Sequence, residues 1–393
     1  MRYFNTAGPC IKAEHYMIET ATRLQGVERL IDMEQYFVIH AARQSGKTTY
    51  LRDLTERLNS EGKYYALYCT LESLYKVEDM EKGTPEIVKT IKRALRFSAI
   101  PHAETFAEKP EYDNFTGVIN TELTLFCMKL DKPFVILFDE ADCLSEDTLI
   151  SFMKQLREGH NNRSTIPFVS SIALVGMRNI RDYKVKIRPD SETMGSTSPF
   201  NVVTETLTLK NFTKEEVASL YRQHTDETGQ LFDTDAIELI FEQTQGQPWL
   251  VNAIVREVIE KILQLDFTRP VTAELAKKAI QTIILRRDTH IDSLLERLKE
   301  ERVRRVIEPM LMGEDFFERS SDDYQYVTDL GLIKDVDYKI QPANPIYAEV
   351  IARTLSFDAQ SKIIQKKLDV KLWNFFQHRG TEGTEFHRGG KII

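Results

Sequence analysis

The chain has 393 residues, which at about 150 residues per domain predicts two or three structural units. A hydrophobic fraction of 42% beside 28% charged residues is typical of a globular protein and excludes wholesale disorder. The formal net charge of -8 excludes a generally cationic protein that coats nucleic acid, although it leaves a local basic patch open. No apolar run approaches the roughly 20 residues that span a bilayer, and the N-terminus has no apolar signal segment. We therefore expect a cytoplasmic protein without a membrane partner.

Strand and helix patterns alternate over the first 210 residues. Apolar runs predict strands at residues 36–40, 64–69, 134–138, 168–175 and 204–209. Helical patterns lie between them, and one helix is expected to open with Thr84 as its cap and Pro85 at its first position. The alternation predicts an α/β fold with a five-stranded parallel sheet and helices on both faces.

Helices dominate after residue 210. A capping box at Thr213–Glu216 opens the first, and further helical segments cover roughly 235–245, 248–265 and 272–286. A long mixed-charge helix over 291–311 and a strand-turn-strand pattern over 326–340 are typical of a winged helix. We therefore expect a core over residues 1–210, a helical lid over 211–288, a winged-helix-like domain over 289–357 and a poorly ordered tail over 358–393.

A phosphate-binding turn follows the first strand. Residues 41–48 read AARQSGKT and depart from the pattern GxxxxGK[ST] only in Ala41 at the first glycine. A strand that enters a tight loop, with a helix beginning at its end, aims backbone N–H groups at phosphate. This core is therefore expected to be a P-loop NTPase sheet. The expected nucleotide-binding residues are Arg43, Gln44, Ser45, Gly46, Lys47, Thr48 and Thr49. Lys47 is expected to reach the β- and γ-phosphates, and the Thr48 hydroxyl to ligate Mg²⁺.

Two acids end the apolar strand at 134–138. Asp139 is expected to hold Mg²⁺ through water, and Glu140 to polarise the water that attacks the γ-phosphate. The alternative is that both carboxylates cap the next segment. A second adjacent acid favours hydrolysis by water over transfer to another acceptor.

Two further positions carry open alternatives. Arg178, at the end of the fourth strand, is a candidate sensor of the γ-phosphate or a solvated loop arginine. The cations over 178–188 belong to a solvated loop or contact a phosphate backbone. The corner at Gly246–Pro248 either sets the lid against the phosphate site or is an ordinary turn between helices.

Five segments carry a resemblance to a known family. They are FNTAGPC (4–10), QYFVIHAARQSGKTT (35–49), VILFDEADCL (135–144), TQGQPWLVNAI (244–254) and ANPIYAEVIARTL (343–355). Over about residues 1–356 the chain resembles the bacterial AAA-like ATP-binding proteins, among the AAA+/STAND-type P-loop ATPases and near the archaeal ATPase group.

The resemblance implies a P-loop core, a helical lid and a winged helix, with ATP and Mg²⁺ as cofactors. It implies that Lys47 and Thr48 bind phosphate and metal, and that Asp139 and Glu140 serve metal and water. It matches Gly246 and Pro248 to the lid motif of STAND-type members, and the segment from Phe4 to Thr6 to the adenine side. Longer members continue into a PD-(D/E)XK nuclease-like domain, which the last residues here do not resemble, so we expect no nuclease activity.

The leading hypothesis is a Mg²⁺-dependent ATPase whose nucleotide state moves the lid and the winged helix. Its output would pass to an unknown protein partner, in signalling or defence. One alternative is a winged-helix module that docks on DNA and is tuned by ATP, which the acidic net charge disfavours. Another is a nucleotide-binding scaffold with negligible turnover. The sequence identifies no arginine finger and leaves oligomeric assembly open.

Overall fold

All five strands of the core sheet run parallel, in the order β2-β3-β4-β1-β5. The computed structural model describes residues 1–106, 115–176, 199–286, 288–313, 321–337 and 339–355. The strands are β1 (Tyr36–His40), β2 (Tyr65–Thr70), β3 (Phe134–Asp139), β4 (Ser171–Gly176) and β5 (Val203–Thr208). The predicted five-stranded parallel sheet is confirmed. Because the strands are parallel, the loop after β1 and the acids at the end of β3 lie at the same edge of the sheet, and because β4 alone separates β1 from β3, they lie close together.

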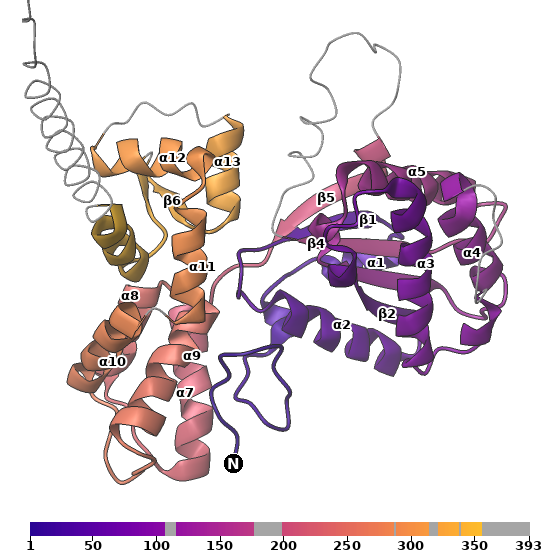
Figure 1. Ribbon diagram of the computed structural model, residues 1–393. Coiled ribbons are helices and arrows are strands. Elements are labelled where there is room, and N and C mark those ends of the chain that lie inside the picture. Colours follow the sequence, from indigo (N-terminus) through magenta and orange to yellow (C-terminus); the bar gives the residue numbers. More distant parts are fainter. Residues whose placement is uncertain (107–114, 177–198, 287, 314–320, 338, 356–393) are drawn as a thin grey trace, which may run out of the picture.

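Helices cover both faces of the sheet (Figure 1). One face carries α1 (Val27–Asp32) and α2 (Lys47–Glu61), and the other carries α3 (Met80–Arg96), α4 (Val118–Cys127) and α5 (Glu146–Asn162). Successive residues of a strand point to opposite faces, so Phe37 packs on the α2 side and Val38 on the α3 side. With apolar cover on both faces, β1, β3 and β4 are buried along their whole length.

Helix α3 begins earlier than expected. Asp79 is its N-cap and Pro85 lies inside it, so the prediction of a helix that opens at Thr84 is wrong. Thr84 is fully buried, and its hydroxyl donates to Ser151 on α5 at 3.5 Å. The Asp79 cap stabilises the first turn and packing on α5 stabilises the second, where Pro85, the sixth residue of the helix, removes one helical hydrogen bond.

The remaining helices form the second half of the molecule. We call residues 211–286 the helical region; it contains α7 (Lys214–Thr228), α8 (Thr234–Thr244), α9 (Pro248–Arg256), a π-helical turn (Glu257–Ile262) and α10 (Ala273–Arg286). We call residues 288–355 the C-terminal module; it contains α11 (Thr289–Arg297), α12 (Glu301–Leu311), α13 (Asp322–Asp329), the antiparallel strands β6 (Ile333–Val336) and β7 (Lys339–Pro342), and helical residues 345–355. The predicted capping box at Thr213 is confirmed.

Two expectations for the C-terminal module are wrong. The single helix predicted over 291–311 is two helices, and Glu300 is the N-cap of the second. The break lets Leu298 and Val303 both enter the core that the module shares with the helical region. Tyr326, predicted to begin a strand, lies in α13, and the hairpin starts only at β6.

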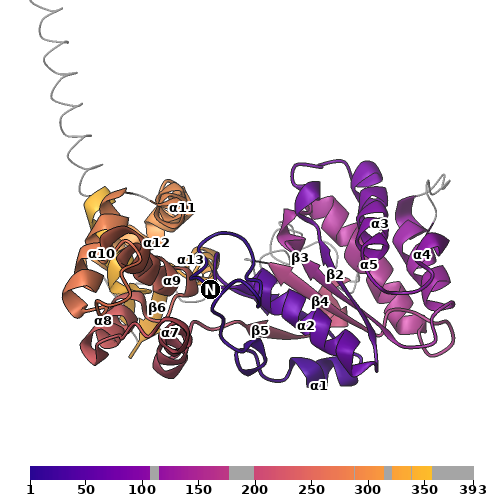
Figure 2. The same cartoon turned by 90° about the horizontal axis from the view of Figure 1, so that it is seen from below.

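The N-terminal segment, residues 1–23, connects the two halves. In Figure 2 it lies between the helical region and the sheet. Phe4 and Tyr16 belong to the core of the helical region, whereas Leu24 belongs to the core under α2. Among the described helices, none combines the length and the apolar character that crossing a membrane requires. The predicted tail at 358–393 lies outside the described residues.

Candidate functional site

The phosphate-binding loop, residues 41–46, connects the end of β1 to the start of α2. Gly46 is the N-cap of α2 and has a left-handed backbone, with φ 91° and ψ 20°. Glycine adopts this conformation without strain. The N–H groups of a first helical turn have no partner within the helix, so Lys47–Thr49 offer donors and a positive helix end to an anion. Ala41 is 1% exposed in the core under α2, which explains why an apolar side chain stands at the pattern's first glycine.

Lys47 points back into this loop. Its Nζ donates to the carbonyl oxygens of Ala41 at 3.0 Å and Ala42 at 3.2 Å, and the residue is 7% exposed. Burial lowers the pKa of Lys47, while the negative charges of Glu140 and Asp139 oppose that shift. The ammonium group is therefore held inside the loop and close to the acids at the end of β3.

Thr48 and Asp139 join the loop to β3. The Thr48 hydroxyl donates to Asp139 Oδ2 at 2.8 Å, and the Glu140 backbone N–H donates to Asp139 Oδ1 at 3.0 Å. Mg²⁺ prefers oxygen ligands and usually takes only one or two from protein, with phosphates and water completing its shell. No group of three or more His, Cys, Asp or Glu in the described part of the chain could hold a metal ion. The oxygen atoms of Thr48 and Asp139 are of the kind that Mg²⁺ accepts as ligands.

Glu140 comes directly after Asp139. It has a left-handed backbone, φ 55°, and is half-buried. Burial raises the pKa of Glu140; the positive charge of Lys47 opposes the shift, and Asp142 and Asp139 reinforce it. A carboxyl group with a raised pKa beside a phosphate site is suited to accept a proton from water.

Arg43 and Gln44 lie in the loop, but their side chains contact the C-terminal module. Arg43 Nη1 donates to the hydroxyl of Ser293 at 2.9 Å, and the Gln44 side-chain oxygen is hydrogen-bonded to the His290 ring. Both partners lie on α11. These predicted nucleotide-binding residues therefore leave their backbone groups, rather than their side chains, for a phosphate.

Gly331 of the C-terminal module also lies against the loop. A Cβ atom at this glycine, which has φ 72°, would lie 2.6 Å from the Cβ of Ala42. Nearby, His40 Nε2 at the end of β1 lies 3.7 Å from Asp329 Oδ1. The module therefore packs directly on the phosphate-binding loop.

Arg23, which belongs to none of the sequence motifs, is hydrogen-bonded to the backbone carbonyl of Ser45. Arg23 Nη2 donates to the carbonyl oxygens of Ser45 at 3.1 Å and Lys210 at 2.6 Å, and its guanidinium lies 4.7 Å from the ring centroid of Phe212. In a trans peptide the C=O and the N–H point in opposite directions. The bond to Ser45 therefore turns the N–H of Gly46 away from Arg23.

Thr49 contacts the N-terminal segment. Its hydroxyl accepts the backbone N–H of Cys10 at 2.9 Å. Trp249 Nε1 on α9 donates to the carbonyl of Thr6 at 2.8 Å, and Asn252 donates to that of Asn5 at 3.0 Å. The segment that the resemblance assigns to the adenine side thus lies between α2 and α9.

Pro248 is the first residue of α9, as the turn pattern predicts. The corner before it needs glycine, because a Cβ at Gly246 would lie 1.9 Å from the carbonyl oxygen of Phe212. Gln247 donates from Nε2 to the carbonyl of Gln44 at 3.3 Å. The corner therefore contacts the phosphate-binding loop.

The arginines of α12 are paired with acids. Arg302 and Arg305 lie 3.1 Å and 3.2 Å from Asp323, and Arg304 lies 2.7 Å from Glu308. Arg302 and Arg305 therefore pair with α13, whereas Arg304 pairs with an acid one turn along its own helix. Arg178 and the cations after it lie outside the described residues.

Three residues at the site escaped the sequence reasoning: Arg23, Tyr68 and His290. The Tyr68 hydroxyl on β2 donates to Asp139 Oδ2 at 3.0 Å. The contact of Tyr68 with Asp139 can be predicted only once β2 is known to pair with β3. Arg23 and His290 come from the N-terminal segment and α11, far from the motif, and no local pattern marks them.

The sheet order, the loop and the paired acids define the fold of the P-loop ATPases. Residues 11–353 match the family model of the AAA-like domain, and the chain belongs to this family. No curated protein gives a significant sequence match.

Solved structures resemble the chain at low sequence identity, and the first of them has the same fold. The Walker-type ATPase of Pyrococcus abyssi is 15% identical, with a TM-score of 0.61 over 89% of this chain and 99% of that one. The ORC2 protein of Aeropyrum pernix, in ADPNP and ADP complexes, is 14% identical, with a TM-score of 0.44 over 87% and 93% of the two chains. The RuvB Holliday junction branch migration motor of Thermotoga maritima is 11% identical, with a TM-score of 0.41 over 84% and 92%.

Proposed function

We propose that the chain binds ATP with Mg²⁺ and hydrolyses it. The observation that carries this proposal is the 2.8 Å hydrogen bond from Thr48 to Asp139, which joins the phosphate-binding loop to the acid strand beside the inward-pointing Lys47. In this proposal the N–H groups that follow Gly46 and the Lys47 ammonium bind the phosphates. Thr48 and, through water, Asp139 hold Mg²⁺, which would neutralise charge on the phosphate oxygens.

Glu140 is the proposed general base. Its neighbour Asp139 is engaged by the Thr48 hydroxyl and the Glu140 N–H, which leaves Glu140 as the adjacent carboxylate available to a water molecule. The raised pKa of Glu140 makes its carboxylate a better proton acceptor than an exposed glutamate. Mutations can separate the phosphate binding proposed for Lys47 from the general-base role proposed for Glu140.

We further propose that nucleotide state reaches the C-terminal module through the phosphate-binding loop, as in a STAND-type switch that signals to a protein partner. Here the helical region acts as the lid and the C-terminal module as the winged helix. Ala42, Arg43 and Gln44 are consecutive, and each contacts the module. A change of the loop on binding phosphate would therefore alter contacts that the module makes. Pro248 and the N-terminal segment are the proposed adenine side.

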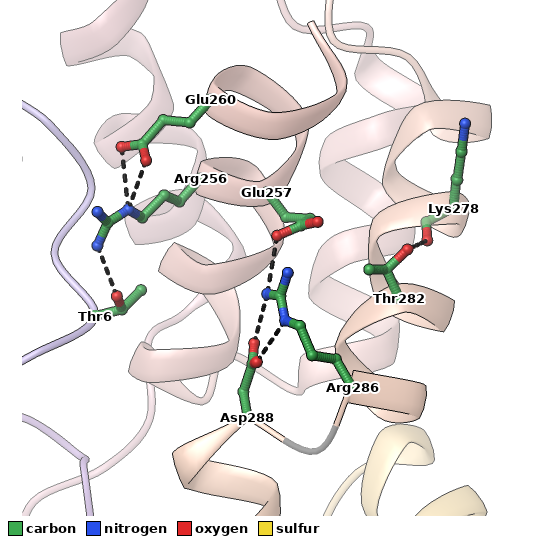
Figure 3. Close-up of polar contacts among 8 residues, drawn as sticks. All are labelled: Thr6, Arg256, Glu257, Glu260, Lys278, Thr282, Arg286 and Asp288. Carbon is green, nitrogen blue, oxygen red and sulfur yellow. Dashed lines mark hydrogen bonds and ion pairs between the residues drawn. The ribbon is translucent and has the colours of Figure 1, made fainter. Parts of the chain in front are cut away.

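Two arginines tie the helical region to its neighbours (Figure 3). Arg256 donates to the Thr6 hydroxyl at 2.8 Å and to Glu260 at 3.0 Å. Arg286, the last residue of α10, lies 2.9 Å from Glu257 and 2.6 Å from Asp288. Arg286 therefore spans the connection between the helical region and the C-terminal module, where a movement between the two would have to occur.

The test is ATP binding and phosphate release by the full chain, with Lys47→Ala as the variant. The matched control is Lys63→Ala, because Lys63 is exposed beyond the other end of α2 and pairs with Asp32. We expect Lys47→Ala to lose ATP binding by at least about tenfold while the control binds normally. Equal affinity in wild type and Lys47→Ala would refute the site. Sizing the protein with and without ATP tests the proposed switch.

A further inference from the structure

Tyr68 is the third donor to the buried carboxylate at the centre of the site. Its hydroxyl donates to Asp139 Oδ2 at 3.0 Å, the same oxygen that accepts the Thr48 hydroxyl at 2.8 Å. The other oxygen, Oδ1, accepts the Glu140 N–H at 3.0 Å. Asp139 is 1% exposed, so these donors replace the water that would otherwise orient its carboxylate.

The sheet topology explains why Tyr68 can reach Asp139. Strands β2 and β3 are parallel neighbours, with Tyr68 beside Leu137 and Thr70 beside Asp139. Alternate residues of a strand share a face, so Tyr68, Leu137 and Asp139 all point toward α2. The Tyr68 ring packs against the core under α2, and the guanidinium of Arg52 lies 5.3 Å from the ring centroid.

Beyond the packing of its ring, Tyr68 has a hydroxyl that can restrict rotation of the Asp139 carboxylate. The final torsion of an aspartate is broad and roughly two-fold, so a carboxylate held on one edge can turn. The Thr48 hydroxyl has a second task in the proposed function, because its oxygen is the protein ligand to the metal. Tyr68 is not a proposed metal ligand, so its hydroxyl can donate to Asp139 Oδ2 whether or not a metal ion is bound.

We propose that Tyr68 is a positioning residue for the metal site: its hydroxyl fixes the Asp139 carboxylate in the orientation that receives a nucleotide-bound divalent cation. This inference rests on the proposed function and adds to it a residue on β2. It predicts that Tyr68 contributes to the part of nucleotide affinity that depends on Mg²⁺ and contributes nothing to the part that does not.

The experiment is calorimetric binding of a non-hydrolysable ATP analogue, adenylyl imidodiphosphate, to the full chain in Mg²⁺ and in EDTA. The variant is Tyr68→Phe, which keeps the ring and removes the hydroxyl. The matched control is Tyr65→Phe, because the Tyr65 hydroxyl, on the same strand, donates to the exposed Asp131 at 2.9 Å. Both variants are first compared with wild type by thermal melting.

We expect Tyr68→Phe to lower affinity in Mg²⁺ by about tenfold, as for loss of a hydrogen bond to a charged group, with unchanged affinity in EDTA. Tyr65→Phe should match wild type in both conditions. Equal affinities of Tyr68→Phe and wild type in Mg²⁺ would overturn the role of Tyr68 alone. A loss in EDTA as large as in Mg²⁺, or an equal loss in Tyr65→Phe, would also overturn it. If the wild type fails to bind the analogue, the proposed function itself is wrong.

Discussion

The ring of His290 is hydrogen-bonded to the side chain of Gln44, which links α11 to the phosphate-binding loop 246 positions earlier in the chain. Because the Gln44 oxygen can only accept, the neutral ring carries its proton on Nδ1, and Nε2 accepts the Tyr347 hydroxyl at 2.6 Å. Trp249 and Tyr347 both stack on the ring, with centroid distances of 4.8 Å and 5.6 Å. His290 thus connects the loop, α9 and the C-terminal module.

This arrangement predicts how stability depends on pH. Burial lowers the pKa of His290 to about 3, and the positive charge of Arg43 adds to the shift. Above the ordinary pKa of about 6.5 neither state takes a proton, so the full stability is present. As the pH falls from about 6.5 toward 3, only the unfolded chain gains the proton, and stability falls by up to about 1.4 kcal/mol per pH unit.

Denaturant unfolding at several pH values between 7 and 4 measures this slope. We expect His290→Asn to have a shallower slope than wild type, whatever its absolute stability. His102→Asn is the control, because His102 is exposed. An unchanged slope in His290→Asn would assign the pH dependence to other groups.

Glu140→Gln is expected to retain ATP and to slow phosphate release by about 100-fold or more, the usual contribution of a general base. Because burial raises the pKa of Glu140, the wild-type rate should fall as the pH drops through that raised value, as the base becomes protonated. The residual rate of Glu140→Gln should not show this fall at low pH. A wild-type rate in Glu140→Gln would remove the residue from the base role.

Gly331→Ala tests the contact between the C-terminal module and the loop. A left-handed backbone costs a non-glycine residue about 1 kcal/mol, and this cost also applies to the control Gly229→Ala, where φ is 76° and the space is open. At Gly331 the new Cβ would also meet Ala42 at 2.6 Å, and such overpacking adds about 1–3 kcal/mol. We expect a larger loss of stability than in the control, together with weaker ATP binding. Normal ATP affinity in Gly331→Ala would argue against coupling.

Arg23→Met tests the support behind Ser45. Loss of the charged hydrogen bond is expected to weaken ATP binding by about tenfold, because the N–H of Gly46 is no longer held in place. Arg29→Ala, on neighbouring α1 and exposed, should bind ATP normally. Calorimetric titration with ATP compares the three proteins, and normal affinity in Arg23→Met would contradict the role.

Arg286→Ala tests the connection between the helical region and the C-terminal module. It leaves the Glu257 carboxylate, whose side chain is 9% exposed, without its partner, and we expect a loss of about 2 kcal/mol. Lys214→Ala removes an exposed pair with Glu238 and should cost under about 1 kcal/mol. Adding Glu257→Gln to Arg286→Ala should restore part of the stability, because the buried charge is removed. Denaturant unfolding of the four proteins measures these differences, and no recovery in the double variant would contradict the mechanism.

Local patterns were enough to predict several parts of this protein. The strands β1 and β3, the glycine before Lys47 and the turn at Pro248 are set by neighbours in the chain, through burial on both faces, backbone conformation and capping. The predicted start of α3 failed because Asp79 caps the helix upstream and packing against α5 places Pro85 inside it. The predicted helix over 291–311 is interrupted at Glu300, which caps a second helix, and the residues on either side of the break, Leu298 and Val303, are both buried in one core.

The sequence alone determined that a strand, a glycine-lysine-threonine turn and a strand ending in two acids belong to this chain, because each is a short-range pattern. Tertiary structure decided that Tyr68 reaches Asp139, that Arg23 supports Ser45 and that His290 contacts Gln44. These contacts depend on strand order and on how helices far apart in the chain pack together. Both follow from burial of apolar surface across the whole molecule, which no local spacing records.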